Sequence, residues 1–250
     1  MDKISVCMAT HNGEKYIKRQ LDSILIQLTQ DDEVVISDDS SSDRTLDIIK
    51  GFSDYRIRLY ENNTFSSPIF NIENALKKAS GEIIVLSDQD DVWLNKKIAV
   101  IKQEFTGASA GIKLIVLDGH IVDEHETVMH ESIFERINSG EGLLKNIYNN
   151  TYMGCCMAFS RDLLEIALPF PRDIPMHDMW LGLLAELFGK VKFVREKTIM
   201  YRRHAESVTN LSLRLDVIKQ IKRRCHLITS LLGRSLHVKC GRKAVRDKQI

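Results

Sequence analysis

Three short apolar runs and one run of alternating polar and apolar residues are separated by amphipathic segments in the first 105 residues, and this pattern constrains the fold more than any other feature of the sequence. Apolar residues recur at helical spacing between the runs, over residues 14–27, 43–49 and 71–79. The runs themselves have the length and composition of strands and cover residues 4–8, 34–36, 56–60 and 83–86. Strands and helices that alternate through short connections are typical of βαβ units. The sequence therefore predicts an α/β fold with a mainly parallel central sheet flanked by helices.

Three of these predicted strands end in polar side chains. The polar clusters occupy residues 10–12, 38–39 and 88–91. Ligands of open α/β sheets bind outside the carboxyl ends of the strands, so the three clusters are expected to meet in one crevice.

The third cluster is the most acidic, with Asp88, Asp90 and Asp91 directly after the run Ile-Ile-Val-Leu. Three neighbouring carboxylates repel one another unless a cation neutralises them. Oxygen ligands favour Mg2+ or Mn2+, ions that also hold substrate phosphates. A polar turn with helix-capping acids would be the simpler interpretation of an isolated Asp-x-Asp, but the other polar strand ends favour a site.

The composition is that of an ordinary globular protein, with 44% apolar and 28% charged residues in a chain of 250. One compact, enzyme-sized body is expected. No run approaches the ~18 to 20 apolar residues of a membrane helix, and no signal peptide is visible at the start. Five cysteines without C-x-x-C spacing favour reduced thiols in a cytoplasmic protein.

The net charge of +1 hides a contrast between the body and the tail of the chain. Residues 211–250 hold 11 Lys or Arg against 2 Asp or Glu, which leaves 24 basic and 32 acidic residues in 1–210. The tail is predicted to be an amphipathic helix, with an apolar face made of Val217, Ile218, Ile221, Cys225, Ile228 and Leu232. This face could lie on an anionic membrane, pack on the body or pair with a second subunit.

The second half of the chain is less regular. Strands are expected over residues 114–117, 154–159, 191–194 and 198–200, and a helix is expected to begin at His177. A polar stretch over residues 119–142 includes His120, His125 and His130, whose spacing of five falls on no single helix face, so they are expected in loops.

Several segments, taken in order, resemble glycosyltransferase family 2, the inverting sugar-nucleotide transferases of the GT-A fold. The resemblance covers roughly residues 3–208. It rests on SVCMATHNG at residues 5–13, LDSI at 21–24, ISDDSSSD at 36–43, ASGE at 79–82, LSDQDDVW at 86–93, TYMGCC at 151–156, HDMW at 177–180 and YRRH at 201–204. The forms SDQDDVW and HDxW are particularly similar to rhamnosyltransferase-like members.

The resemblance implies a GT-A domain in which residues 1–105 bind the nucleotide sugar and residues 106–210 supply the acceptor site and the catalytic base, followed by the helical tail at 211–250. Two departures concern the base pocket: Ala9 and His11 stand where the family often has Pro and Tyr, and Ser40 where it often has Gly. The Gln-x-x-Arg-Trp motif of processive synthases is missing, so one sugar per encounter is expected.

The family match implies a role for each polar cluster. Asp90 is the main expected ligand of Mg2+ or Mn2+, with Asp88 beside the ribose or the metal and His204 completing the coordination. Asp39 would accept a hydrogen bond from the ring N–H of uracil or thymine, a donor that cytosine lacks at that position. The remaining residues expected around the donor nucleotide are Thr10, Asn12, Glu14, Asp38 and Asn71. An Asx turn that caps the next helix is the alternative role for the acids at 38–43.

Asp178 is the expected catalytic base, because an inverting displacement needs one carboxylate to take the proton of the attacking hydroxyl. Its position at the start of a helix also suits a capping role. His177 and Trp180 beside it, and Asp91, are expected near the acceptor or the sugar, although Trp180 could equally belong to the core.

The expected partners are a dTDP- or UDP-linked sugar donor and a saccharide or lipid-linked saccharide acceptor in surface polysaccharide synthesis, with no nucleic acid. The expected location is the cytoplasm, peripheral to the membrane if the tail binds it. Alternatives are a metal-dependent phosphohydrolase of the haloacid dehalogenase type, a sugar-nucleotide pyrophosphorylase or a domain that only binds. The first would carry its acids on the first strand, and the second needs a Gly-rich basic first loop that Gly13, Glu14 and Lys15 match poorly.

Overall fold

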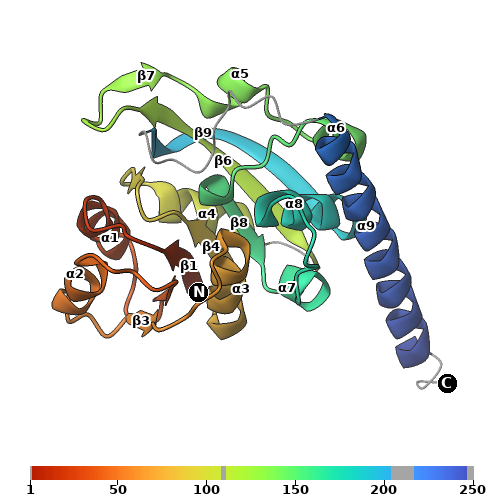
Figure 1. Cartoon of the computed structure of the whole chain (residues 1–250), viewed down its shortest axis with the longest axis horizontal. Helices are drawn as coiled ribbons and strands as arrows, with labels where there is room; N and C mark the ends of the chain where they lie inside the picture. The colour runs from red at the N-terminus through yellow and green to blue at the C-terminus, as the bar shows by residue number, and fades with distance from the viewer. Residues whose placement is uncertain (1, 108–110, 204–216, 247–250) are drawn as a thin grey trace.

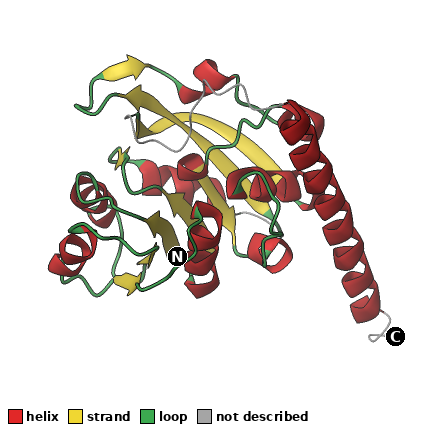
Figure 2. Ribbon diagram, in the orientation of Figure 1, coloured by secondary structure: helices red, strands yellow, loops and turns green. Residues whose placement is uncertain are grey.

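The computed structural model describes residues 2–107, 111–203 and 217–246. In these residues a nine-stranded sheet is surrounded by helices, and a long C-terminal helix runs along one side of the body (Figures 1 and 2). The strands follow one another in the order β3-β2-β1-β4-β8-β6-β9-β5, and β7 pairs with β6.

The first half of the chain forms the alternating pattern that the sequence predicts. Strands β1, β2, β3 and β4 pair in parallel, and nearly all residues of β1, β2 and β4 are buried, as expected for strands covered on both faces. The elements are β1 (Ile4–Thr10), α1 (Ile17–Leu25), β2 (Glu33–Asp38), α2 (Thr45–Gly51), β3 (Ile57–Tyr60), α3 (Pro68–Lys78) and β4 (Ile83–Ser87).

The second half extends the same sheet with mixed pairing. Strand β8 is antiparallel to both β4 and β6, whereas β9 is parallel to β6, so only the first half of the sheet is parallel throughout. The elements are β5 (Val92–Trp93), α4 (Lys97–Phe105), β6 (Lys113–Val122), β7 (Val128–His130), α5 (Ile133–Ile137), α6 (Leu143–Tyr148), the 3-10 helix η1 (Gly154–Cys156), β8 (Met157–Ser160), α7 (Asp162–Ala167), α8 (His177–Phe188), β9 (Lys190–Arg202) and α9 (Val217–Arg246).

Strand β6 is longer than expected and does not end at Asp118. The Asp118 carboxylate is buried within the strand and accepts hydrogen bonds from the Ser132 hydroxyl (2.7 Å) and the Phe134 backbone N–H (3.1 Å), which satisfy it at the start of α5. His120 therefore lies in β6 and His130 in β7, so the prediction that both are loop residues is wrong; only His125 lies in the turn between these strands.

Strand β9 is continuous over 13 residues, where the sequence suggested two short strands. Its pairing with β6 shifts register on both sides of Asp118, and these irregularities accommodate the polar residues that interrupt the apolar pattern of β9.

The sheet curls so that its last strand returns toward β4. Four residues separate the end of β4 at Ser87 from the start of β5 at Val92, and two of the four form a turn. In the sheet order β5 is four places from β4, about 19 Å in a flat sheet at ~4.8 Å per strand. A tight turn cannot span that distance, so the sheet curls and brings β5 close to the end of β4.

Candidate functional site at the carboxyl ends of the strands

The three polar clusters lie at one edge of the sheet, as the sequence predicts. Thr10 pairs in register with Asp38 on β2, and Met8 pairs with Ser87, the last residue of β4. The polar residues that follow these strands therefore leave the sheet at similar levels. The loops after β1, β2 and β4 therefore border the place where the crevice is expected.

Asp38 and Thr10 hold the loops at this edge of the sheet through hydrogen bonds. The Asp38 carboxylate accepts hydrogen bonds from the Thr10 hydroxyl (2.7 Å), the Ser41 hydroxyl (2.6 Å) and the Ser41 N–H (2.9 Å). Both side chains are almost completely inaccessible, at 0% and 1% exposed. The two side chains fix the loops after β1 and β2, and their contact with a nucleotide stays a prediction.

Asp39 and Asn71 lie next to Thr10 and are 8% and 2% exposed. The Asp39 oxygens accept the backbone N–H groups of Phe65 (2.7 Å) and Ser67 (3.2 Å). Asn71 donates from its amide nitrogen to the Thr10 carbonyl (3.0 Å), while its amide oxygen is buried without a partner. A buried acceptor without a partner costs free energy, so the Asn71 side-chain oxygen is a candidate acceptor for a ligand or an ordered water.

The loops after β1 and β2 hold each other through Asn12 and Glu14. The Asn12 side-chain oxygen accepts from the Ser42 N–H (2.8 Å), and Glu14 accepts from the Arg44 N–H (3.0 Å). Ser40, which stands where the family often has Gly, adopts a φ of 58°. That left-handed conformation explains the preference for glycine, since other residues adopt it at a cost.

The acidic turn at residues 88–91 combines exposed and buried carboxylates. Asp88 is exposed and Asp90 is partly exposed, whereas Asp91 is 0% exposed. One Asp91 oxygen accepts the Arg202 N–H (2.9 Å) and the other is buried with no partner. Asp91 cannot reach a sugar or an acceptor from this position, so its predicted acceptor contact is wrong; it ties the turn to β9.

Burial and mutual repulsion make this cluster electrostatically costly. The atoms around the Asp88 carboxylate displace water from it, and this desolvation, together with the negative charges of Asp90 and Asp178, raises the pKa of Asp88 to about 7. Burial and the same acidic neighbours raise the pKa of Asp91 well above its usual range. Two buried cations lie nearby, Arg202 and Lys97. The Lys97 ammonium donates to the Cys155 carbonyl (2.6 Å) and lies 4.5 Å from the centre of the Trp93 ring.

These residues fit a divalent cation. Asp88, Asp91 and Cys155 each bring one ligand-type atom to within 4.8 Å of the others, and the second Asp91 oxygen has no partner. Carboxylates are the ligands that Mg2+ and Mn2+ prefer. The Cys156 hydrogen bond, burial and the nearby acids raise the pKa of the Cys155 thiol, so this sulfur is a poor ligand for a hard ion. His204 lies outside the described residues.

Three side chains that sequence reasoning missed hold the acidic turn in place. Gln89 bridges to His11 in both directions, accepting the His11 N–H (3.0 Å) and donating to its carbonyl (2.9 Å). Gln20 of α1 donates to the Asp88 carbonyl (2.9 Å) and Arg202 donates to the Asp90 carbonyl (2.9 Å). The backbone of the turn is thus fixed from α1, the first loop and β9.

Asp178 lies in the first turn of α8, beside the acidic turn although 90 residues separate it from Asp88 in the sequence. One of its oxygens accepts the Asn150 amide (3.2 Å) and the Met179 N–H (2.5 Å). Burial raises the pKa of Asp178 to about 6 despite these hydrogen bonds. With this pKa most of the Asp178 carboxylate is ionised at pH 7, and the side chain is half-buried.

The two neighbours of Asp178 in the motif differ in their surroundings. Burial lowers the pKa of His177 to about 4, so its imidazole is neutral at pH 7, and its Nδ1 is buried without a partner. Trp180 is 0% exposed and donates from Nε1 to the Ala167 carbonyl (3.0 Å). Trp180 is therefore a core residue, the alternative that the sequence left open, and its expected place near the acceptor or the sugar is wrong.

Comparison with known proteins adds sequence and fold relationships. The family model for glycosyl transferase family 2 matches residues 5–166. A dTDP-rhamnosyl transferase of Shigella flexneri is 40% identical over 214 residues, covering 79% of this chain and 71% of the relative. An Escherichia coli enzyme named UDP-Glc:alpha-D-GlcNAc-diphosphoundecaprenol beta-1,3-glucosyltransferase is 27% identical over 73% of this chain and 70% of its own length.

A solved structure also shares the fold. The mannosyltransferase of Pyrobaculum calidifontis, in complex with GDP-Man and Mn2+, matches with a TM-score of 0.59 at 18% identity over 94% of this chain and 64% of that one. Two further curated relatives are matched over a smaller share of their length: the match covers 65% of one and 39% of the other.

Proposed function

Because the chain belongs to glycosyl transferase family 2, we propose that it transfers one sugar at a time from a nucleoside diphosphate to a saccharide acceptor, with inversion at the anomeric carbon. The names of the two relatives support a dTDP- or UDP-linked donor, and rhamnose is the first sugar to test. The relative that acts on a diphosphoundecaprenol-linked sugar supports a lipid-linked saccharide acceptor in surface polysaccharide synthesis.

The donor half of the proposed site uses the loops after β1, β2 and β4. Asp39 accepts the ring N–H of the pyrimidine, and Asn71 offers its unpartnered oxygen to the nucleotide. Asp88 and Asp91, whose carboxylates come together, and Asp90 between them would hold Mg2+ or Mn2+, which would supply positive charge to stabilise the leaving diphosphate. The Mn2+ complex of the mannosyltransferase with the same fold supports this assignment.

The acceptor half uses Asp178. An acceptor hydroxyl attacks the anomeric carbon from the face opposite the diphosphate, the carbon–oxygen bond to the diphosphate breaks, and Asp178 takes the hydroxyl proton. The observation that carries this proposal is the place of Asp178 beside the acidic turn: a Cβ at Gly154 would lie 3.9 Å from the Asp178 Cβ, and the thiol of the next residue, Cys155, lies within 4.8 Å of an Asp88 oxygen. His177, neutral at pH 7, lies next to the base and can contact the acceptor as a hydrogen-bonding group.

The test is a transfer assay with purified protein, Mn2+ and a panel of dTDP-, UDP- and GDP-sugars, followed by calorimetry on variants. Asp178→Asn is expected to lower kcat by about 10^2- to 10^4-fold while donor affinity stays near wild type, because the amide cannot accept the proton. Asp162→Asn is the matched control, since Asp162 is an exposed acid in the first turn of α7.

Two results would contradict the proposal at different points. If donor affinity of Asp178→Asn falls in step with kcat, Asp178 is a binding or structural residue. If no sugar nucleotide is turned over with any saccharide acceptor, while hydrolysis of a phosphate ester is observed, the chain is a hydrolase.

A further inference from the structure

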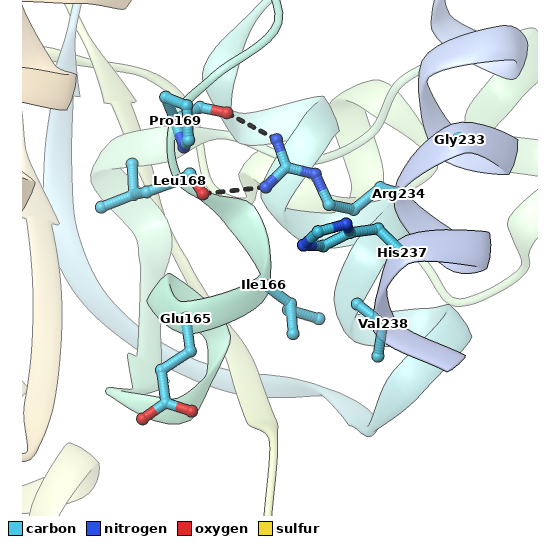
Figure 3. A pocket seen from close by; sticks show the side chains of 8 residues that line it. All are labelled: Glu165, Ile166, Leu168, Pro169, Gly233, Arg234, His237 and Val238. Carbon is cyan, nitrogen blue, oxygen red and sulfur yellow. Dashed lines mark hydrogen bonds between the residues drawn. The ribbon is translucent and has the colours of Figure 1, made fainter. Parts of the chain in front are cut away.

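Helix α9 is fixed to the body by one of its faces. Leu227 and Leu231 are 0% and 5% exposed, and the Arg234 guanidinium donates to the Leu168 and Pro169 carbonyls at 2.8 and 2.6 Å (Figure 3). The same guanidinium lies 5.6 Å from the centre of the Trp180 ring. The buried leucines adjoin the face that the sequence predicts to be apolar, so part of the helix packs on the body beside that face.

A second face of α9 stays open. Ile228, Leu232 and Leu236 are 40%, 61% and 66% exposed and recur every four residues, which places them in one stripe. The stripe begins next to α6, because Arg224, one turn before Ile228, donates to the Tyr148 carbonyl (2.5 Å) and lies 5.2 Å from the centre of its ring.

Helix α6 adds two exposed apolar side chains at the same end of α9. Tyr148 is 75% exposed and Leu144, one turn earlier, is 81% exposed. We call the five side chains the α6–α9 ridge: Leu144, Tyr148, Ile228, Leu232 and Leu236. Large apolar side chains gathered on an exposed surface mark a site of interaction with a partner or a membrane.

The charge of α9 favours an anionic membrane over a second copy of the protein. Residues 217–246 contain nine Lys or Arg and no Asp or Glu. Two copies of this helix packed through their stripes would repel each other, whereas an anionic bilayer attracts the helix and accepts its apolar side chains. We propose that the α6–α9 ridge docks the protein on an anionic lipid surface.

No helix in the described parts of the chain is both long and apolar enough to cross a membrane. The ridge instead has the pattern of an interfacial surface, in which apolar side chains enter the headgroup region and cations remain in the plane of the phosphates. The C-terminal part of α9 projects beyond the body, which leaves it accessible to a flat surface (Figure 1).

The ridge also adjoins the proposed base. Helix α6 ends at Tyr148, and two residues later the Asn150 amide donates to Asp178. A bilayer under the ridge would therefore lie on the acceptor side of the site. This relation rests on the proposed function, and it fits an acceptor whose saccharide is carried on a lipid.

The test is co-sedimentation of the full-length protein with phosphatidylglycerol-containing vesicles and with phosphatidylcholine vesicles. Wild type is expected to bind the anionic vesicles at least tenfold more tightly, with affinity falling as salt increases. Leu232→Glu is expected to weaken binding at least tenfold. Ile26→Glu, which puts the same charge at an 80% exposed apolar residue of the first half, is expected to bind as wild type does.

Unchanged binding of Leu232→Glu, or equal binding of wild type to both kinds of vesicle, would overturn the proposal. So would a wild-type dimer in analytical ultracentrifugation that dissociates on Leu232→Glu, because the ridge would then be an interface between two copies. Circular dichroism checks that both variants fold. Transfer to a soluble acceptor should be retained in Leu232→Glu; its absence from wild type would refute the proposed function and leave the vesicle result standing.

Discussion

At the scale of single residues, Asp178 and Asn150 form the pair whose chemistry is most open to measurement. Burial raises the pKa of Asp178 to about 6, whereas the Asn150 N–H, by donating to the carboxylate, opposes that rise. A base must be ionised to act, so kcat/KM should fall about tenfold per pH unit below about pH 6.

Asn150→Ala removes a donor to the charged form and should move this acidic limb to higher pH. The measurement is the pH profile of kcat/KM. Asn149→Ala, an exposed neighbour, is the control and should keep the wild-type profile. A lower rate in Asn150→Ala with an unmoved profile would mean that Asn150 acts only through the fold.

The acids of the site could be predicted from the sequence because carboxylates after apolar runs are unusual enough to notice. Which of these acids are exposed and which are buried could not be predicted, since Asp90 and Asp91 are adjacent and differ only in the direction in which the turn points them. Gln20, Gln89 and Arg202 were missed because amide and guanidinium side chains that hold backbone carbonyls leave no periodic signal.

At the scale of elements, α8 depends on a glycine where helix propensity alone favours alanine. A Cβ at Gly182 would lie 2.4 Å from the Tyr152 ring, whose hydroxyl donates to Glu186 (2.5 Å) on the same helix. Gly182→Ala should lower the free energy of unfolding by about 1 to 3 kcal/mol, because overpacking exceeds the gain in propensity.

Gly233→Ala is the matched change in α9, where a Cβ would meet nothing within 4 Å. It should be neutral or stabilise by up to about 1 kcal/mol. Chemical denaturation followed by circular dichroism measures both variants. Equal effects of the two substitutions would show that the Tyr152 contact does not limit the packing of α8.

The strand boundaries in the first half follow from the sequence to within two residues, because β1, β2 and β4 are each built around a short apolar run. In the second half, Asp118 and Gly119 interrupt β6 in the sequence but not in the structure. The Asp118 carboxylate is satisfied by α5, and Gly119 is needed because a Cβ would lie 2.5 Å from the Ile199 carbonyl of β9. Such tertiary compensation is invisible to local patterns.

At the scale of the whole molecule, the carboxylates of the acidic turn repel one another, and a bound cation should relieve this repulsion. Mn2+ together with UDP should raise the free energy of unfolding by about 2.7 kcal/mol at a hundredfold excess over Kd, measured as a shift in melting temperature. Asp90→Asn should abolish most of the shift, and without ligand it should melt no lower than wild type, because it relieves repulsion on Asp88 and Asp91.

Asp47→Asn, an exposed acid of α2, is the control and should retain the shift. The metal assignment would fail if UDP alone gave the full shift, or if Asp90→Asn responded to Mn2+ and UDP as wild type does.

The pairing of β5 with β9 also governs when activity can appear during synthesis. The acids at residues 88–91 leave the ribosome early, but β5 finds its partner only when Ile199 and Met200 have emerged, and Arg202 secures the turn last. A nascent or truncated chain that stops before β9 therefore carries every acid of the proposed donor site but lacks the β9 contacts that hold the acidic turn in position. Stalled translation products of this protein should consume no sugar nucleotide.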